Sequence, residues 1–279
     1  MKPVPFEYVR PASLQEAMEE MSRRGEDARP LAGGQSLVPL LGMRLARPEC
    51  LVDLNRLPEL RGLEPGHDGV RAGAMTRLAQ VERTPWVKEA IPPLAAAVAA
   101  VGHFQIRNRS TVGGCLAHCD PAAELPALLL LLEGRVRIGS RRGEREIGAA
   151  DLLRGPFTTS LEPDELLLEA FYPFQPGSGW AFAEVARREG DYALVGAAVY
   201  QAPGGPPRFV VFGAGPVPQR LPNAESAAAA GTSRAEVAAA AASEIEALSD
   251  IHASARYRRT VGGRLVARLL EQARDAASD

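Results

Sequence analysis

The chain has 279 residues, of which 46% are hydrophobic and 24% are charged, and its formal net charge is −2. This length and composition are typical of a folded protein with one large or a few small domains, and they exclude an intrinsically disordered chain. A charge so close to zero gives no general attraction to nucleic acid, so we expect no nucleic-acid partner.

The cysteines and the apolar runs indicate whether the protein binds a metal, is secreted or spans a membrane. The three cysteines, Cys50, Cys115 and Cys119, include no Cys-x-x-Cys pair and offer too few ligands for a metal cluster, so we expect free thiols and no metal site. The start lacks the apolar core of a secretory signal. The longest apolar run, Leu125–Leu132, is far shorter than the ~20 residues that span a bilayer. We therefore predict a cytoplasmic protein without a membrane span.

Strand and helix signals alternate over residues 1–57. Phe6–Arg10 and Pro30–Ala32 are short strand candidates, and Cys50–Leu54 is an apolar run typical of a buried strand. Between the first two, Ser13 and Glu16 form a capping-box pattern at the start of a helix. This order predicts a small α/β lobe.

Residues 58–175 predict a second lobe of mixed helices and strands. Thr76 is a candidate helix cap, and Pro92 and Pro93 are expected to interrupt the chain before a helix over Leu94–Val101. A further helix is expected over Pro121–Leu132. The strand candidates are Gly69–Gly73, Arg135–Ile138, Arg145–Ile147 and Leu166–Tyr172.

A Pro- and Gly-containing linker, Gln175–Gly179, precedes the predicted C-terminal domain, residues 176–279. Three strand candidates come first, over Trp180–Arg187, Tyr192–Gln201 and Arg208–Phe212. Helices are then expected over residues 224–230, 233–248 and 255–276. Strands followed by helices predict an antiparallel sheet with helices on one face, so the chain as a whole is of the α+β class.

Two Gly-Gly segments carry the functional signal: Leu31-Ala-Gly-Gly-Gln-Ser-Leu37 and Thr111-Val-Gly-Gly114. Glycine lacks a Cβ atom, and consecutive N–H groups in such a turn form an anion-binding nest. Two such loops, each beside a hydroxyl group, suggest convergence on one long phosphate-bearing ligand. Spacing alone leaves two ordinary tight turns as the alternative. Ser36 is a candidate cap for a short helix after the first loop.

Polar residues beside the second loop have two interpretations each. His103 and His118 flank the loop, where they either contact a cofactor or form structural hydrogen bonds. Asp120 and Glu124 lie near the start of a predicted helix, where a carboxylate is favourable with the helix dipole. The same carboxylates are also suited to accept hydrogen bonds from ribityl or ribose hydroxyls.

Other nucleotide and catalytic motifs are absent. Arg208–Gly215 begins like a dinucleotide-binding unit, but Pro216 and Pro218 stand where its helix would start and the third glycine is missing. There is no Gly-x-x-x-x-Gly-Lys-Ser/Thr and no Gly-x-Ser-x-Gly, which removes the simplest nucleotidase and serine hydrolase interpretations. No two histidines stand at metal-ligand spacing on one predicted helix.

The segments Ala32–Ser36, Ile106–Gly114 and Leu116–Pro126 together resemble the FAD-binding medium subunit of molybdenum hydroxylases, a group that includes aerobic carbon monoxide dehydrogenase and the xanthine dehydrogenases. The resemblance covers nearly the whole chain, and further matching segments lie at residues 155–159, 163–167, 187–193 and 252–258. It implies a two-lobed FAD-binding domain of the vanillyl-alcohol-oxidase type, followed by a small α+β domain.

The same resemblance implies the FAD site. Backbone N–H groups of both loops, with the Ser36 and Thr111 hydroxyls, would hold the pyrophosphate. Glu124 would lie on the adenosine side, and Leu167 and Tyr192 would pack against the flavin ring. The full set of candidate cofactor residues is Leu31, Ala32, Gly33, Gly34, Gln35, Ser36, Leu37, His103, Thr111, Val112, Gly113, Gly114, His118, Asp120, Glu124, Leu167 and Tyr192.

The family's partners are also implied. Electrons would come from a [2Fe–2S] small subunit, pass through FAD and leave to an external acceptor, with a molybdopterin-binding large subunit completing a dimer of heterotrimers. Because the flavin supplies the redox chemistry, we expect no catalytic nucleophile or base in the chain. Relatives often have a lysine near the flavin in the strand that here includes Phe182–Val185, and this chain has none.

Two alternatives stay open at this point. One is a stand-alone FAD oxidoreductase of the same fold, which would need a polar catalytic group at the flavin ring. The other is a non-catalytic FAD-binding or assembly protein. Neither the substrate of the complete enzyme nor the electron acceptor follows from the sequence.

Overall fold

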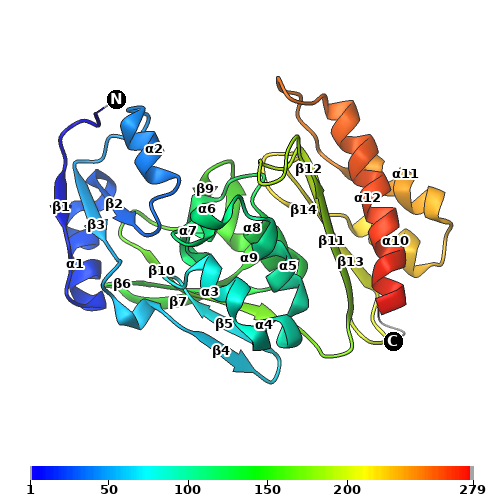
Figure 1. Cartoon of the computed structure of the whole chain (residues 1–279), viewed down its shortest axis with the longest axis horizontal. Coiled ribbons are helices and arrows are strands. Elements are labelled where there is room, and N and C mark those ends of the chain that lie inside the picture. The colour runs from blue at the N-terminus through cyan, green and yellow to red at the C-terminus, as the bar shows by residue number, and fades with distance from the viewer. Residues whose placement is uncertain (1, 277–279) are drawn as a thin grey trace.

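The computed structural model describes residues 2–276. Three larger sheets, besides one of two strands, follow one another along the described part of the molecule, with the N-terminal lobe at one end and the last helices at the other (Figure 1). The predicted α+β class, with two FAD-domain lobes and a small C-terminal domain, is confirmed. Within the described range, no helix combines the length and apolar character needed to cross a membrane.

The first lobe is a three-stranded parallel sheet in the order β1-β3-β2. Helix α1 begins after Ser13, whose side chain accepts from the Glu16 N–H, and ends at Gly25, whose φ of 54° suits glycine. Its buried face packs with β3 in a small core. The elements are β1 (Glu7–Val9), α1 (Leu14–Arg24), a 3₁₀ turn (Gly25–Asp27), β2 (Ala28–Leu31), α2 (Leu37–Gly42) and β3 (Cys50–Asp53).

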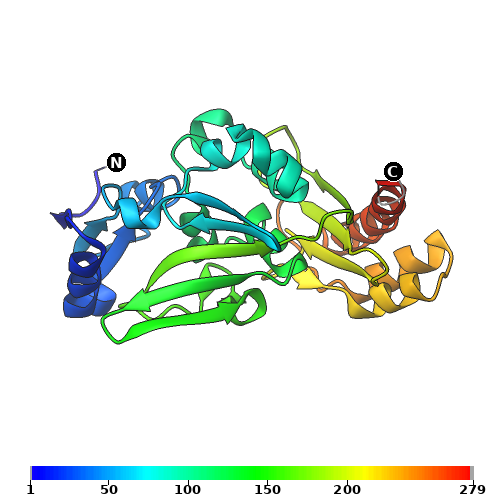
Figure 2. The ribbon, with the colours of Figure 1, turned by 90° about the horizontal axis from the view of Figure 1, so that it is seen from below.

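The second lobe is built on a five-stranded antiparallel sheet in the order β4-β5-β10-β6-β7. Figure 2 shows this sheet between the first lobe and the C-terminal domain. Its strands are β4 (Leu63–Gly66), β5 (Gly69–Gly73), β6 (Arg135–Ser140), β7 (Gly143–Gly148) and β10 (Leu166–Pro173), and β8 (Leu153–Gly155) pairs separately with β9 (Thr158–Thr159). The helical turns are a 3₁₀ turn (Pro58–Leu60), α3 (Leu78–Arg83), α4 (Pro85–Ala90), α5 (Pro92–Ala100), α6 (Phe104–Arg107), α7 (Val112–His118), α8 (Glu124–Leu131) and α9 (Ala149–Leu152).

The C-terminal domain is a four-stranded antiparallel sheet in the order β11-β12-β13-β14, covered by α10–α12. Both faces of its central strands are buried. Val199 and Val211 pack toward the helices, whereas Tyr200 and Phe212 join the core of the second lobe around α8. The elements are β11 (Gly179–Val185), β12 (Val195–Gln201), β13 (Pro207–Phe212), β14 (Gln219–Arg220), α10 (Pro222–Ala229), α11 (Arg234–Glu244) and α12 (Ala255–Ala276).

This second buried face was not predicted, and it fixes the C-terminal sheet against the FAD domain. Helix α8 explains it: seven of its eight residues are buried, so it presents apolar side chains in every direction. The boundaries predicted after residues 57 and 175 fall between the three sheets. They remain a proposal for how the chain is divided.

Several predicted helix starts are wrong in detail. Thr76 does not cap α3; its buried hydroxyl donates to the Gly62 carbonyl at 2.7 Å, and α3 begins after Arg77. Pro92 starts α5 instead of interrupting it, because proline at the first turn has no N–H to leave unpaired. Helix α8 begins at Glu124 rather than at residue 121.

The predicted capping box at Ser13 differs from a second one that the structure has at Ser233. At Ser233 the reciprocal box with Glu236 is complete. At Ser13 only half of it forms, because the Glu16 carboxylate accepts from the Ala12 N–H at 2.7 Å instead of from Ser13.

Candidate functional site

The two Gly-Gly loops lie against each other. A Cβ atom on Gly33 would stand 2.4 Å from the carbonyl oxygen of Arg109 and 2.8 Å from the Cα of Ser110, so this contact requires glycine. A Cβ atom on Gly114 would stand 3.6 Å from the Cβ of Ala32. The convergence that was one interpretation of the spacing is therefore present in the structure.

The first loop offers a row of unused donors. Within residues 2–276, the five N–H groups of Gly33–Leu37 donate no hydrogen bond, whereas the Gly34 and Ser36 carbonyls accept from the following turn. Gly34 has a φ of 77°, which turns the backbone as in an anion-binding nest. Ser36 does not cap α2 through its side chain, contrary to the prediction, so its hydroxyl is also unused. This arrangement suits a phosphate group.

The second loop is different, because three of its N–H groups already donate hydrogen bonds inside the protein. The Val112 N–H donates to the Thr76 carbonyl, and the Gly113 N–H donates to the Ala74 carbonyl at 2.8 Å. The Gly114 N–H donates to the Thr111 hydroxyl oxygen at 3.0 Å. The expectation that N–H groups of both loops face a phosphate is thus not met for this loop as it stands. In the structure this loop packs against the first one, and its predicted contact with the pyrophosphate stays a proposal.

Beyond the second loop, three carboxyl groups gather. Glu124, at the start of α8, is only 8% exposed, and burial raises its pKa to about 8, with further contributions from the charges of Glu184 and Asp120. Glu184 comes from β11 in the C-terminal domain, so this group joins two domains. Asp120 is fixed by accepting from the Ala122 N–H at 2.9 Å.

Glu184 is the residue that sequence reasoning missed. Its Oε2 atom is buried without a hydrogen-bond partner in the described part of the chain, and burial raises the pKa of the carboxyl to about 7. It lies in the strand, Phe182–Val185, that lacks the expected lysine. A carboxylate in that strand was the only feature of the sequence that could have identified it. Its proximity to Glu124 depends on how β11 lies relative to the start of α8, which the sequence does not reveal.

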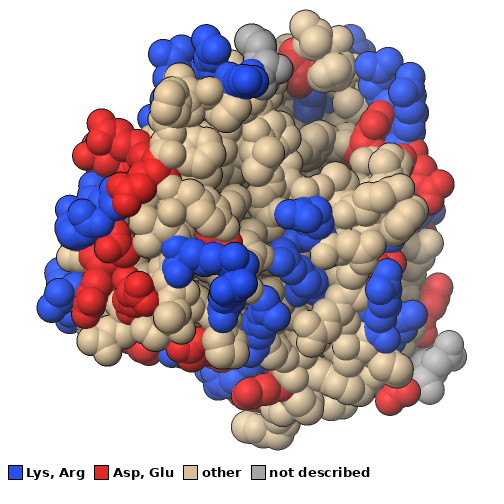
Figure 3. All heavy atoms as spheres, turned by 60° about the vertical axis from the view of Figure 1, so that its left-hand side comes forward, with Lys and Arg blue, Asp and Glu red and all other residues tan. Residues whose placement is uncertain are grey.

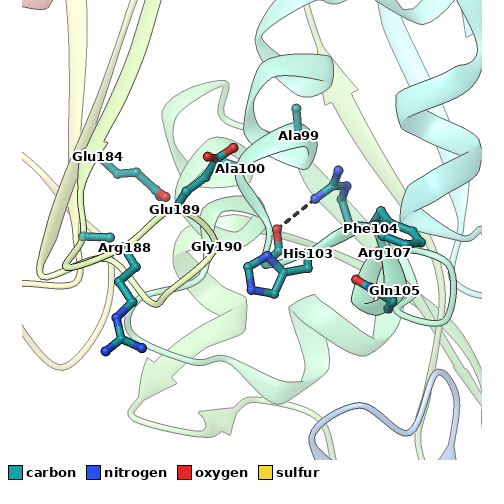
Figure 4. A pocket seen from close by; sticks show the side chains of 12 residues that line it. Ala99, Ala100, His103, Phe104, Gln105, Arg107, Glu184, Arg188, Glu189 and Gly190 are labelled. Carbon is teal, nitrogen blue, oxygen red and sulfur yellow. Dashed lines mark hydrogen bonds between the residues drawn. The ribbon is translucent and has the colours of Figure 1, made fainter.

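A cavity of about 660 Å³ opens between α5, α6 and the segment after β11. Figure 4 shows Glu184 and His103 on its two sides. A Cβ atom on Gly190 would stand 2.4 Å from the His103 ring, so glycine lets the two sides approach. Arg107 closes one end, where it donates to the Gly102 carbonyl at 2.9 Å and pairs with Glu82.

The remaining candidate residues divide between this site and the protein core. Tyr192 exposes 70% of its surface, and desolvation of its hydroxyl, with the charges of Asp120 and Glu124, raises its pKa. His118 contacts Phe157, with ring centroids 5.1 Å apart, and burial lowers its pKa. Leu167 is 6% exposed and lies in the core of the second lobe.

Comparison with known proteins agrees with this geometry. The model of the FAD binding domain in molybdopterin dehydrogenase matches residues 4–175, and that of the CO dehydrogenase flavoprotein C-terminal domain matches residues 180–273. The chain is 41% identical to the 6-hydroxypseudooxynicotine dehydrogenase complex subunit alpha of Paenarthrobacter nicotinovorans, over 98% of this chain and 97% of that one. It is 34% identical to the carbon monoxide dehydrogenase medium chain of Hydrogenophaga pseudoflava, over 98% of each.

The structure is also similar to solved structures. A chain of quinoline 2-oxidoreductase from Pseudomonas putida 86 superposes with a TM-score of 0.93 at 35% identity, over 100% of both chains. Fold and loops thus define a two-lobed flavoprotein of the oxidoreductases. More narrowly, the chain belongs to the FAD-binding medium subunits of the molybdenum hydroxylases.

FAD is the cofactor of this family, and the residues present suit it. The unused N–H groups of Gly33–Leu37 match a pyrophosphate. Glu184 lines the cavity, and its buried Oε2 atom has no hydrogen-bond partner in the described part of the chain, so it can still accept a hydrogen bond.

Proposed function

We propose that this chain carries electrons from a [2Fe–2S] small subunit through FAD to an external acceptor, in a complex completed by a molybdopterin-binding large subunit. The proposed assembly is a dimer of heterotrimers. The observation that carries the proposal is the row of five unused N–H groups at Gly33–Leu37, held open by the contact of Gly33 with Arg109. A cytoplasmic location stays a prediction.

Each part of the site has a proposed task. The bound FAD supplies the electron-transfer chemistry. The first loop binds the pyrophosphate through N–H groups and the Ser36 hydroxyl, while Thr111 and Gly114 hold the second loop against it. Glu124 accepts a hydrogen bond from a sugar hydroxyl on the adenosine side.

The flavin ring is proposed to lie toward the cavity. Tyr192 and Leu167 would border the ring, and His103 and Glu184 would line the space by which an acceptor approaches. Burial raises the pKa of the Glu184 carboxyl to about 7. This carboxyl would therefore gain or lose a proton near neutral pH when the charge around it changes. None of these four side chains is proposed to act as a nucleophile.

A stand-alone FAD oxidoreductase remains the second candidate, because Glu184 supplies a polar group at the cavity that such an enzyme would need. The substrate of the complex is not assigned by this chain. Relatives of the flavin chain are named for nicotine derivatives, quinoline and carbon monoxide, which have little chemistry in common.

The test is to purify the tagged chain from its own cells together with whatever chains accompany it, and alone after overproduction. We expect flavin absorption in both, FAD released on denaturation, and iron and molybdenum only in the first preparation. A chain that takes up no FAD in either preparation would contradict the proposed site. FAD without any iron-bearing partner, combined with substrate oxidation by the chain alone, would favour the second candidate.

A further inference from the structure

Two side chains from outside the Gly-Gly loops connect one loop to the other. Asn55 follows β3, and Arg77 comes directly before α3. Both are half-buried, and each forms hydrogen bonds with backbone carbonyl groups next to a loop. We call these two residues the Asn55–Arg77 pair.

Arg77 is held to the second loop by its backbone and by its side chain. Its backbone forms an antiparallel β-bridge with Thr111. Its guanidinium donates to the Arg109 carbonyl, and a Cβ atom on Gly33 would stand 2.4 Å from this same oxygen. The arginine therefore fixes the carbonyl group against which the first loop packs.

Asn55 extends this contact to the first loop. Its side-chain oxygen accepts from the Arg77 guanidinium, and its side-chain N–H donates to the Ala32 carbonyl at 2.9 Å. The same nitrogen donates to the buried Asp53 carboxylate at 2.6 Å, which fixes the orientation of the amide. Ala32 directly precedes the five unused N–H groups of Gly33–Leu37. The amide of one asparagine thus joins the second loop, through Arg77, to the residue that starts the N–H row.

The charges around the pair are compatible with an anion in the first loop. Burial and the nearby charges of Arg61 and Arg109 lower the pKa of Arg77, and the charge of Asp53 acts in the opposite direction. Both acceptors of the guanidinium are neutral oxygens. In the view toward the first lobe, Lys and Arg side chains gather near the middle of the surface, and most acidic ones lie toward its edges (Figure 3). Positive charge on this face favours a phosphate-bearing ligand.

We propose that Asn55 and Arg77 are positioning residues for FAD. They hold the Ala32 and Arg109 carbonyl groups in place and thereby set the direction of the N–H row in the first loop. Neither side chain is proposed to touch the cofactor. This inference rests on the proposed function, because that function assigns the pyrophosphate to the row. Since the contacts are in series, a break at Asn55 should have the same consequence as a break at Arg77.

The experiment is a double-mutant cycle on the full chain, with Asn55→Ala, Arg77→Met and both changes together. Flavin fluorescence titration of the FAD-free protein gives the FAD affinity, and denaturant unfolding gives the stability. The matched control is the cycle of Asn108→Ala and Arg83→Met. This second arginine also donates to an asparagine side chain, at 3.1 Å, but the pair is exposed and joins α3 to the turn after α6.

We expect each single variant to lower the FAD affinity about 10-fold, as for the loss of one hydrogen bond to a charged group. The double variant should lie close to the single ones, whereas independent residues would multiply to a loss of about 100-fold. The control variants should match the wild type. A purely structural role would instead lower the free energy of unfolding and leave the FAD affinity of the folded protein unchanged.

Three results would overturn this inference alone: wild-type FAD affinity in Asn55→Ala, losses that multiply in the double variant, or an equal loss in the control pair. Asn55→Ala changes no charge and removes few atoms, so it tests the proposal even where Arg77→Met fails to fold. A wild-type chain that takes up no FAD would overturn the proposed FAD site and this inference together.

Discussion

The two Gly-Gly loops look alike in sequence and do different things in the structure. The first, Gly33–Leu37, leaves five N–H groups without acceptors inside the chain. In the second loop three of the N–H groups already have acceptors in the protein. Val112 and Gly113 donate to carbonyls of the turn before α3, and Gly114 donates to the Thr111 hydroxyl. A glycine pair therefore marks a close approach of backbones, and whether the approach is to a ligand or to the protein depends on what surrounds it.

Substitution at Gly113 should break the supporting loop and have the largest effect. A Cβ atom there would stand 2.5 Å from the Cβ and 2.8 Å from the Cα of Ala74, and neither can move without shifting β5. We expect Gly113→Ala to lower the free energy of unfolding by about 3 kcal/mol, the upper range for overpacking. Denaturant unfolding of the FAD-free chain measures it. Gly148→Ala is the control, since nothing lies within 4 Å of its Cβ position; equal stability of the two variants would contradict the supporting role.

Substitution at Gly33 should break the binding loop. The added methyl of Gly33→Ala would meet the Arg109 carbonyl at 2.4 Å and push the N–H row away from the second loop. If two charge-assisted hydrogen bonds to the pyrophosphate are lost, FAD affinity should fall about 100-fold or more. Flavin fluorescence titration of the FAD-free protein gives the affinity, with Gly148→Ala again as reference. Unchanged affinity would show that the first loop is only a turn.

The carboxyl cluster beside the second loop can be distinguished from the first loop by pH, because carboxyl groups titrate and backbone N–H groups do not. The pKa of Glu124 is raised to about 8, so its neutral form is favoured in the folded chain. Stability from this source is full below the ordinary carboxyl pKa and is lost as the pH rises toward 8. We expect a loss of about 2 kcal/mol between pH 5 and 8, which is below the limit set by the pKa shift because the effective dielectric constant even of buried sites is well above that of dry protein.

Thermal unfolding across pH should show this slope in the FAD-free wild type and a weaker one in Glu124→Gln, whose amide stays neutral. Glu184, with a pKa raised to about 7, adds to the slope in the same direction, so Glu184→Gln is the companion variant. The lowered pKa of His118 acts oppositely, since its stability is lost as the pH falls through its ordinary range. The same slope in wild type and Glu124→Gln would show that this carboxyl is solvated in the folded chain.

Much of this architecture was predictable from local patterns, and what was not depended on distant contacts. The helix after Ser13 and the apolar run in α8 follow from capping and burial patterns. The pairing of Gly113 with Ala74 joins residues far apart in sequence, as does the meeting of Glu184 with Glu124. No local pattern records which donors are already used, so the sequence identified both loops and could not distinguish their roles.

Thr111 offers the finest test of the difference between the loops, because its hydroxyl caps α7 and lies at their contact. Thr111→Val removes the acceptor of the Gly114 N–H with little change in shape, and loss of a cap costs about 1 kcal/mol. If the second loop acts only as support, FAD affinity should fall no further than this change in stability explains, and Thr111→Ser should restore both. If Thr111→Val instead lowers FAD affinity tenfold or more while unfolding is unchanged, the hydroxyl itself binds the pyrophosphate. Parallel FAD titration and denaturant unfolding of the two variants decide between these outcomes.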